Sequence, residues 1–97
     1  MATYFLLCNY TEQGVRGIKD VPKRRAASKE MAKKLGVEIK GGGIAMGVYD
    51  VVLHVEADTD ATIGTFALSL ASKGNLRTTT VKVLPEAEAD KMIAGVL

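Results

Sequence analysis

The sequence predicts one α+β domain that spans residues 1–97. Strand-like and helix-like segments follow one another in the order β-α-β-β-α-β-α, without an internal linker, repeat or low-complexity stretch. A chain of 97 residues has room for one domain, and its 47% hydrophobic and 25% charged residues are typical of a folded globular protein. Two right-handed crossovers joined by a hairpin give a four-stranded antiparallel sheet with helices on one face. The expected fold is therefore ferredoxin-like βαββαβ, followed by a C-terminal helix.

The first strand is expected at residues 3–10, in the middle of the sheet. Both of its faces are apolar: Tyr4, Leu6 and Cys8 on one side, and Phe5 and Leu7 beside Asn9 on the other. Apolar residues on both faces are typical of a central strand. Its expected neighbour is the third strand, at residues 49–57.

A basic amphipathic helix follows a break at residues 11–14 and a helical turn at residues 14–19. Asp20 is expected to cap this helix, whose first turn contains Pro22. Apolar residues recur there every four positions, at Ala27, Met31 and Leu35. Gly36 is expected to end the helix.

The second strand is expected at residues 37–40, where apolar and charged residues alternate. The glycines at 41–43 interrupt it, and residues 44–46 resume it. No Gly-Lys-Ser/Thr follows these glycines, so a phosphate-binding loop is not expected. They favour a β-bulge, or a bend that lets another backbone approach closely.

The second half of the chain repeats the strand–helix–strand pattern. In the third strand, Val51, Leu53 and Val55 face one way, whereas Asp50, Val52, His54 and Glu56 face the other. Residues 58–60 supply caps for a second helix with apolar residues at helical spacing: Ile63, Phe66, Ala67, Leu70 and Ala71. Residues 74–75 end this helix, and residues 76–83 form a strand rich in Thr and Val. The last helix begins at residues 85–86 and carries an apolar stripe: Ala89, Met92, Ile93 and Val96.

One apolar sheet face stays uncovered in this fold, because the helices lie on the other face. An exposed apolar patch usually marks a partner surface. The expected partner is a second copy of the chain, packed sheet to sheet about a two-fold axis to form a homodimer or a larger homo-oligomer. The terminal helix is expected to cover an edge or to clasp the neighbour.

Charge, cysteine content and the N-terminal sequence argue against several classes of protein: RNA-binding, disulfide-bonded, membrane-spanning and secreted. The net charge is +2, and residues 16–40 hold most of the basic side chains, which we interpret mainly as a solvated helix face. RNA binding is not expected, because the third strand has no base-stacking aromatic after Tyr49. Cys8 is the only cysteine, which excludes an internal disulfide and fits a cytoplasmic location. The apolar start is too short to span a membrane and lacks the features of a signal peptide.

The strongest cluster of candidate catalytic residues is Asp50, His54 and Glu56 on one strand face, together with Asn9 of the first strand, which we expect to run parallel beside it. A histidine oriented by a carboxylate is suited to acid–base chemistry. The favoured interpretation is instead a set of hydrogen bonds and ion pairs across a dimer interface. Asp50 and Glu56 are about 20 Å apart at 3.3 Å per residue and cannot share an ion without a bend. His54 and Glu56 could bind a metal only with ligands from elsewhere in the chain, so no metal site is predicted.

Two further positions are candidates for ligand binding. Gly47 permits a turn two residues before Tyr49. Tyr49 and Asp50 could form the lip of a pocket, or they could have a structural role. Arg77 lies just beyond the second helix and could bind an anion or a carboxylate.

Gly47, Tyr49 and Asp50 also carry a resemblance to the GYD family, which is named for such a Gly-x-Tyr-Asp element. The resemblance runs on to Val55–Ala57 and extends to Asn9–Gly14, to Lys19–Asp20 and Pro22–Arg24, and to Gly74–Thr78. The triple glycine and Asp58 depart from the pattern. The resemblance implies a bacterial or archaeal protein whose fold is similar to dimeric α/β barrel proteins, and it assigns no activity and no cofactor.

The sequence therefore predicts a small homo-oligomeric protein with a ligand-binding or accessory function. One alternative is a small enzyme, similar to an oxygenase or isomerase of the dimeric α/β barrel type, with a pocket between sheet and helices. Another is a regulatory oligomer that binds an anionic partner through its basic helix.

Overall fold

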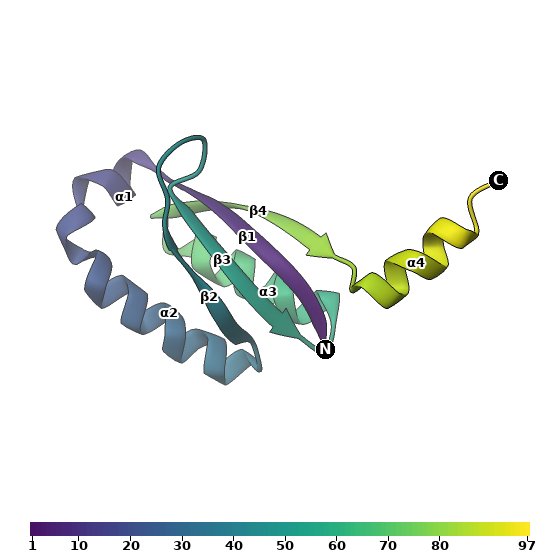
Figure 1. Cartoon of the computed structure of the whole chain (residues 1–97). Helices are drawn as coiled ribbons and strands as arrows, with labels where there is room; N and C mark the ends of the chain where they lie inside the picture. Colours follow the sequence, from purple (N-terminus) through teal and green to yellow (C-terminus); the bar gives the residue numbers. More distant parts are fainter.

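The computed structural model describes all residues, 1–97 (Figure 1). Its elements are β1 (Ala2–Tyr10), α1 (Glu12–Arg16), the 3-10 turn η1 (Ile18–Asp20), α2 (Val21–Leu35), β2 (Glu38–Ile44), β3 (Val51–Ala57), α3 (Asp60–Ser72), β4 (Leu76–Val83) and α4 (Glu86–Ala94). This order confirms the predicted ferredoxin-like α+β arrangement with a C-terminal helix.

The sheet has the strand order β2-β3-β1-β4, with every neighbouring pair antiparallel. The central position of β1 and β3 is confirmed. Asn9 does not lie on a parallel neighbour of β3, however, because β1 and β3 run in opposite directions, with Cys8 opposite Val51 and Ala2 opposite Ala57. Asn9 is consequently at the Asp50 end of β3, far from Glu56.

The core lies between one face of the sheet and α3. Tyr4, Leu6 and Cys8 of β1 are at most 2% exposed, and strand alternation places them on the same face. Val55 and Ala57 of β3 and the α3 residues Ile63, Phe66, Ala67 and Leu70 complete most of this cluster. We call this side of the sheet the covered face and the opposite side the open face.

The glycines do not interrupt β2, contrary to the sequence prediction. The strand continues from Glu38 to Ile44, and a bulge between Ile39 and Gly41 takes up the extra residue. The predicted bulge and close backbone approach are both present. Gly42 has a φ of +115°, and a Cβ at this position would lie 2.1 Å from the Val52 carbonyl oxygen of β3.

The ends of the helices follow the sequence prediction except before α2, where α1 begins at Glu12 rather than at residue 14, and at Asp20. Asp20 belongs to the 3-10 turn before α2 and makes no capping hydrogen bond through its side chain. Thr59 does cap α3, since its hydroxyl oxygen accepts a hydrogen bond of 3.2 Å from the Thr62 N–H. Gly36 ends α2 with a φ of +79°, in the left-handed region that glycine adopts without strain.

The α2 and α4 helices are less tightly packed than α3. Ala32 is the buried residue of α2, with Met31 and Leu35 half-buried, whereas the predicted face residue Ala27 is exposed. The α4 helix projects from the end of β4 (Figure 1) and buries none of its residues. The Cα radius of gyration is 14.8 Å, compared with about 12.5 Å expected for a compact chain of this length. None of the helices has the length and apolar character needed to span a membrane.

Candidate functional site

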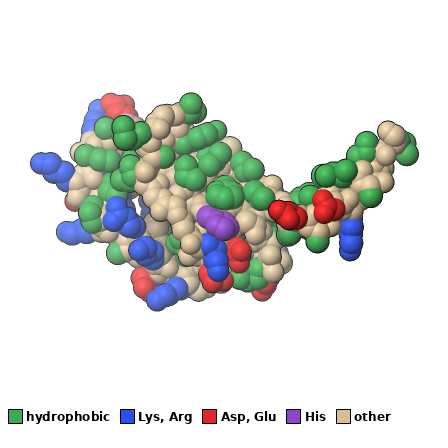
Figure 2. All heavy atoms as spheres, in the orientation of Figure 1, with side chains coloured by type: hydrophobic (Ala, Val, Ile, Leu, Met, Phe, Trp, Pro, Cys, Tyr) green, Lys and Arg blue, Asp and Glu red, His purple; other side chains and the backbone are tan.

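The open face of the sheet is the first candidate site. Hydrophobic side chains gather over the sheet in Figure 2, which views the molecule from this side. Register and strand alternation assign them to β1, β3 and β4. The apolar residues of the open face are Phe5, Leu7, Val52, Val81 and Val83. Val81 and Val83 are 41% and 37% exposed, so this face presents a continuous apolar surface without a helix on it.

His54 is the distinctive polar residue of the open face. Its ring stacks on Phe5 with a centroid distance of 4.9 Å and an interplanar angle of 15°. Its Nε2 atom is buried and has no hydrogen-bond partner within the chain. A buried polar nitrogen without a partner costs free energy, so a local rearrangement that exposed this atom to a polar group from outside the chain would be stabilising.

The four predicted catalytic candidates do not meet at one point. Asn9 and Asp50 lie at one end of the sheet, where Asn9 Nδ2 donates to the Val48 carbonyl at 2.8 Å. The Asp50 carboxylate accepts a 2.9 Å hydrogen bond from the Tyr10 N–H, and the Asp50 N–H donates to the Cys8 carbonyl at 2.9 Å. These contacts hold the β2–β3 loop against the end of β1.

His54 and Glu56 lie farther along β3 on the open face, as the strand period predicted. Glu56 is opposite Thr3 in β1 and opposite Glu38 in β2. Two like charges at directly opposed positions repel each other. Lys40, at 3.3 Å from the Glu38 carboxylate, offsets this repulsion.

The candidate ligand-binding residues are placed as follows. Gly47 has a φ of +136° in the β2–β3 loop, as expected of a glycine in a turn. Tyr49 follows it and is half-buried, before the start of β3. Arg77 is exposed on β4 directly opposite Asn9, which places a cation on the open face at the end that holds Asn9 and Asp50.

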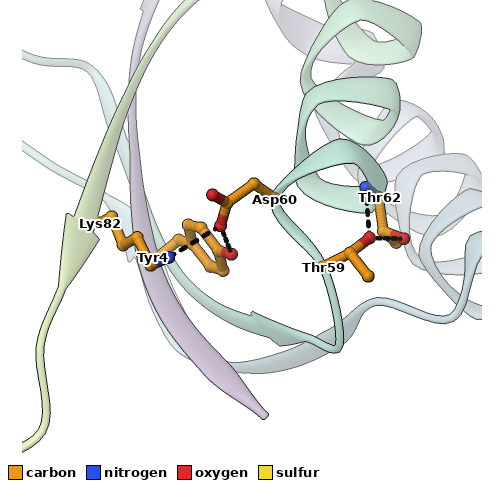
Figure 3. Close-up of polar contacts among 5 residues, drawn as sticks. All are labelled: Tyr4, Thr59, Asp60, Thr62 and Lys82. Atoms are coloured by element: carbon orange, nitrogen blue, oxygen red, sulfur yellow. Dashed lines mark hydrogen bonds and ion pairs between the residues drawn. The ribbon is translucent and has the colours of Figure 1, made fainter.

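A polar network between β1, β4 and α3 was not foreseen from the sequence (Figure 3). The Tyr4 hydroxyl donates a hydrogen bond to Asp60 Oδ1, and Lys82 Nζ lies 3.0 Å from the same oxygen. The ammonium group is also 5.9 Å from the centre of the Tyr4 ring. The network ties the first turn of α3 to the two strands.

The charges of this network shift the pKa values of its members. The hydrogen bond to Asp60, together with burial, raises the pKa of Tyr4 above 10.0. The hydrogen bonds from Tyr4 and Lys82 lower the pKa of Asp60 below 3.8, and the Asp60 partner raises the pKa of Lys82 above 10.5. Tyr4 therefore stays protonated near neutral pH, which makes it a hydrogen-bond donor rather than a base.

A groove lies between α2 and the β2–β3 half of the covered face. Its volume is about 1010 Å³, and half of its 24 lining residues are hydrophobic. The half-buried Met31, Ile39, Val51 and Leu53 contribute to its apolar surface. Five lining residues of α2 and the end of α3 are cationic, Arg24, Arg25, Lys29, Lys33 and Lys73. Glu38 and Lys40 also border the groove, but their paired charges belong to the open face, where Glu38 is opposite Glu56. The groove therefore suits an apolar ligand or segment that carries negative charge.

Two comparisons with known proteins bear on these surfaces. The model of the GYD domain family matches residues 4–93. A protein of Thermus thermophilus named glutamine synthetase and cystathionine beta-lyase binding protein is 32% identical over 89 residues. The aligned region covers 91% of this chain and 94% of that protein. The similarity thus includes the sheet, the loop that carries Tyr49 and Asp50, and most of α4.

Proposed function

Because the chain belongs to the GYD domain family, we propose that it is a homo-oligomeric accessory protein that binds other proteins, with subunits joined through the open face. The observation that carries the self-association is the continuous apolar surface of the open face. The unpartnered His54 Nε2 in the middle of this surface adds to it. The Thermus thermophilus relative, whose name describes a binding protein for two enzymes, supports the accessory role.

Several properties of the chain favour the pairing of two open faces. A chain of this size buries a limited core of its own, and 11 hydrophobic residues are buried here. In a two-fold pair, each copy covers the other's Phe5, Leu7 and Val52, and polar groups of one copy can reach His54 of the other. The free thiol of Cys8 and the bacterial source of the relative support a cytoplasmic location in a bacterium.

Native mass spectrometry of the purified protein tests the self-association. We expect a mass that is a multiple of 10.3 kDa. Leu7→Asp places a charge on the open face and should yield monomer. The matched control is Leu68→Asp, because Leu68 lies on α3 and is already 74% exposed. A monomeric wild-type protein, or dissociation by Leu68→Asp and not by Leu7→Asp, would overturn the pairing through the open face.

The accessory role is tested separately, by titration against purified glutamine synthetase and cystathionine beta-lyase from the same organism. Saturable binding of either enzyme, measured by interferometry with the protein immobilised, is the expected result. An unrelated enzyme of similar mass serves as the control. Equal binding of all three enzymes, or of none, would contradict the proposal.

A small enzyme or ligand-binding protein is the second candidate, and the specific observation in its favour is the groove beside α2. His54→Ala and Lys29→Ala together distinguish the two candidates. The accessory function predicts that His54→Ala weakens the oligomer, since His54 lies in the paired face, and that Lys29→Ala leaves the pairing of open faces intact. A ligand-binding groove predicts the loss of a retained small molecule from the native mass spectrum of Lys29→Ala, because Lys29 lines the groove.

A further inference from the structure

The α4 helix carries an apolar stripe that is largely exposed. Met92 and Ile93 are 60% and 61% exposed, and the helix buries no residue. At 3.6 residues per turn, these two side chains share one face with Ala89. Figure 2 shows hydrophobic side chains along one side of the projecting helix. An amphipathic helix in this state has its apolar face available for a partner.

Acidic residues border this stripe on both sides. Helical spacing places Glu86 and Asp90 along one border, beside Ile93, and places Glu88 along the other border, beside Met92. The single cation of the helix, Lys91, lies on the opposite side. The docking face of α4 is therefore an apolar strip with negative charge on both borders.

The groove beside α2 has the complementary pattern. Its apolar surface is bordered by five cations of α2 and the end of α3, and the paired charges of Glu38 and Lys40 belong to the open face. An acidic amphipathic helix satisfies both features at once, because its stripe meets the apolar surface while its flanking carboxylates meet the Lys and Arg side chains. Recognition of an amphipathic helix by an apolar groove is a common mode of peptide binding.

Within one chain, the first turn of α4 stays outside this groove. Two residues, Leu84 and Pro85, connect α4 to β4, and at most about 3.5 Å per residue limits their reach to about 7 Å. The groove lies at β2 and β3, and β2 is at the opposite edge of the sheet from β4. Three strand spacings separate the edges, about 14 Å. Figure 1 also shows α4 leading away from the sheet.

We propose that α4 of one copy of the chain docks into the α2–β2–β3 groove of a second copy. This contact goes beyond the pairing of open faces and uses a different surface of the molecule. Loss of one contact therefore does not imply loss of the other, and variants of the open face and of the groove test them separately.

Site-directed disulfide formation between two differently substituted chains tests the contact. Full-length Met92→Cys, with a thiol on the stripe of α4, is mixed with Ala27→Cys, whose thiol lies at the groove. Mass spectrometry after mild oxidation by oxidised glutathione reports the mixed disulfide. The native Cys8 is buried and does not compete. Two control partners replace Ala27→Cys in parallel mixtures: Leu68→Cys on α3 and Thr79→Cys on the open face.

We expect the mixed disulfide with Ala27→Cys in at least about tenfold excess over either control. Equal yields from all partners, a dominant product with Thr79→Cys, or no mixed disulfide would each overturn the proposal. A small anionic molecule retained in the native mass spectrum, together with the absence of the Ala27 product, would show that the groove holds a ligand instead.

Charge reversal provides a second measurement in chains without added thiols. Glu86→Lys combined with Glu88→Lys replaces attraction by repulsion at the groove and should weaken association between copies by about tenfold. Lys91→Glu is the matched control on the opposite side of α4 and should leave association unchanged. Equal effects of the two changes would contradict docking in the stated orientation.

Discussion

A single methyl group at Gly42 tests how closely β2 approaches β3. Gly42 has a φ of +115°, and its added Cβ would lie 2.1 Å from the Val52 carbonyl oxygen and 2.9 Å from the Leu53 Cα. All of these neighbours are backbone atoms, so no side-chain rotation relieves the overlap. In Gly42→Ala, either β2 moves away from β3 or the backbone at residue 42 changes conformation.

The cost of this change has two parts. A non-glycine residue in a sparsely populated backbone region costs about 1–3 kcal/mol. Moving the strand also weakens a ladder hydrogen bond, which contributes about 1 kcal/mol. The free energy of unfolding should therefore fall by about 3 kcal/mol, a large share of the roughly 5–15 kcal/mol typical of a domain. With an m-value of about 1.5 kcal/mol/M in urea, the midpoint falls by about 2 M.

Gly43→Ala is the matched control one residue away. A Cβ at Gly43 has no atom within 4 Å, and its φ lies outside the glycine-favoured positive region. We expect this variant to be as stable as the wild type or slightly more stable, because alanine loses less backbone entropy on folding. Urea unfolding followed by circular dichroism, at equal protein concentrations, compares the two. Midpoints within about 0.5 M of each other would refute the close approach of β2 and β3.

Two further predictions concern ionisable residues of the core. Tyr4→Phe removes the hydrogen bond to Asp60 and should cost about 1 kcal/mol. Because this bond is the largest cause of the lowered Asp60 pKa, the stabilisation is present above pH 3.8 and is lost as pH falls through the folded-state pKa. As the pH falls, the midpoint of thermal unfolding should drop more steeply in the wild type than in the variant. Parallel curves of midpoint against pH would contradict this. Burial raises the pKa of the Cys8 thiol from 9.0 to about 11, so the folded protein should resist an aromatic disulfide reagent at about pH 8 and react in urea. The contribution of the protonated Cys8 thiol to the free energy of unfolding is fully present below pH 9.0 and is lost as the pH rises through about 11. Rapid reaction of the folded protein with the reagent would contradict the burial of Cys8.

The alternation of side chains predicted most of the sheet. Tyr4, Leu6 and Cys8 are buried on one face because a strand places every second residue on the same side. The alternation did not reveal which face the helices cover, since Phe5 and Leu7 make the other face apolar as well. The covered face is the one on which α3 packs, and this choice depends on contacts between distant parts of the chain.

Local signals failed where pairing between strands or a neighbouring turn determined the structure. The glycines at 41–43 predicted a break, but β3 provides a continuous partner and the bulge after Ile39 restores the register. Asp20 has the side chain of a helix cap, yet the preceding 3-10 turn holds its backbone in a helical conformation that is unsuited to capping.

The contacts of the candidate polar residues also could not be predicted without the strand register. Strand period correctly placed His54 and Glu56 on one face, but the antiparallel register separates Asn9 from both of them. The Tyr4–Asp60 hydrogen bond joins positions 56 residues apart, and Lys82 meets Tyr4 only because β4 pairs with β1 in this register. Without a known strand register, the sequence contains no signal for this network.

The arrangement of the surfaces also has a consequence for partner binding. If two copies pair through their open faces, α2 and α3 lie on the outside of the pair, because both helices are on the covered side of each sheet. A second protein would then meet the helical layer, where the Lys and Arg side chains of α2 and the exposed Leu68 of α3 lie. Charged residues at such an interface mainly accelerate encounter and favour an acidic partner surface, whereas an exposed apolar side chain contributes affinity. Pairing through the open faces therefore leaves the helical layer available to an enzyme, except at the α2–β2–β3 groove, where a docked α4 would occupy the Lys and Arg side chains of α2.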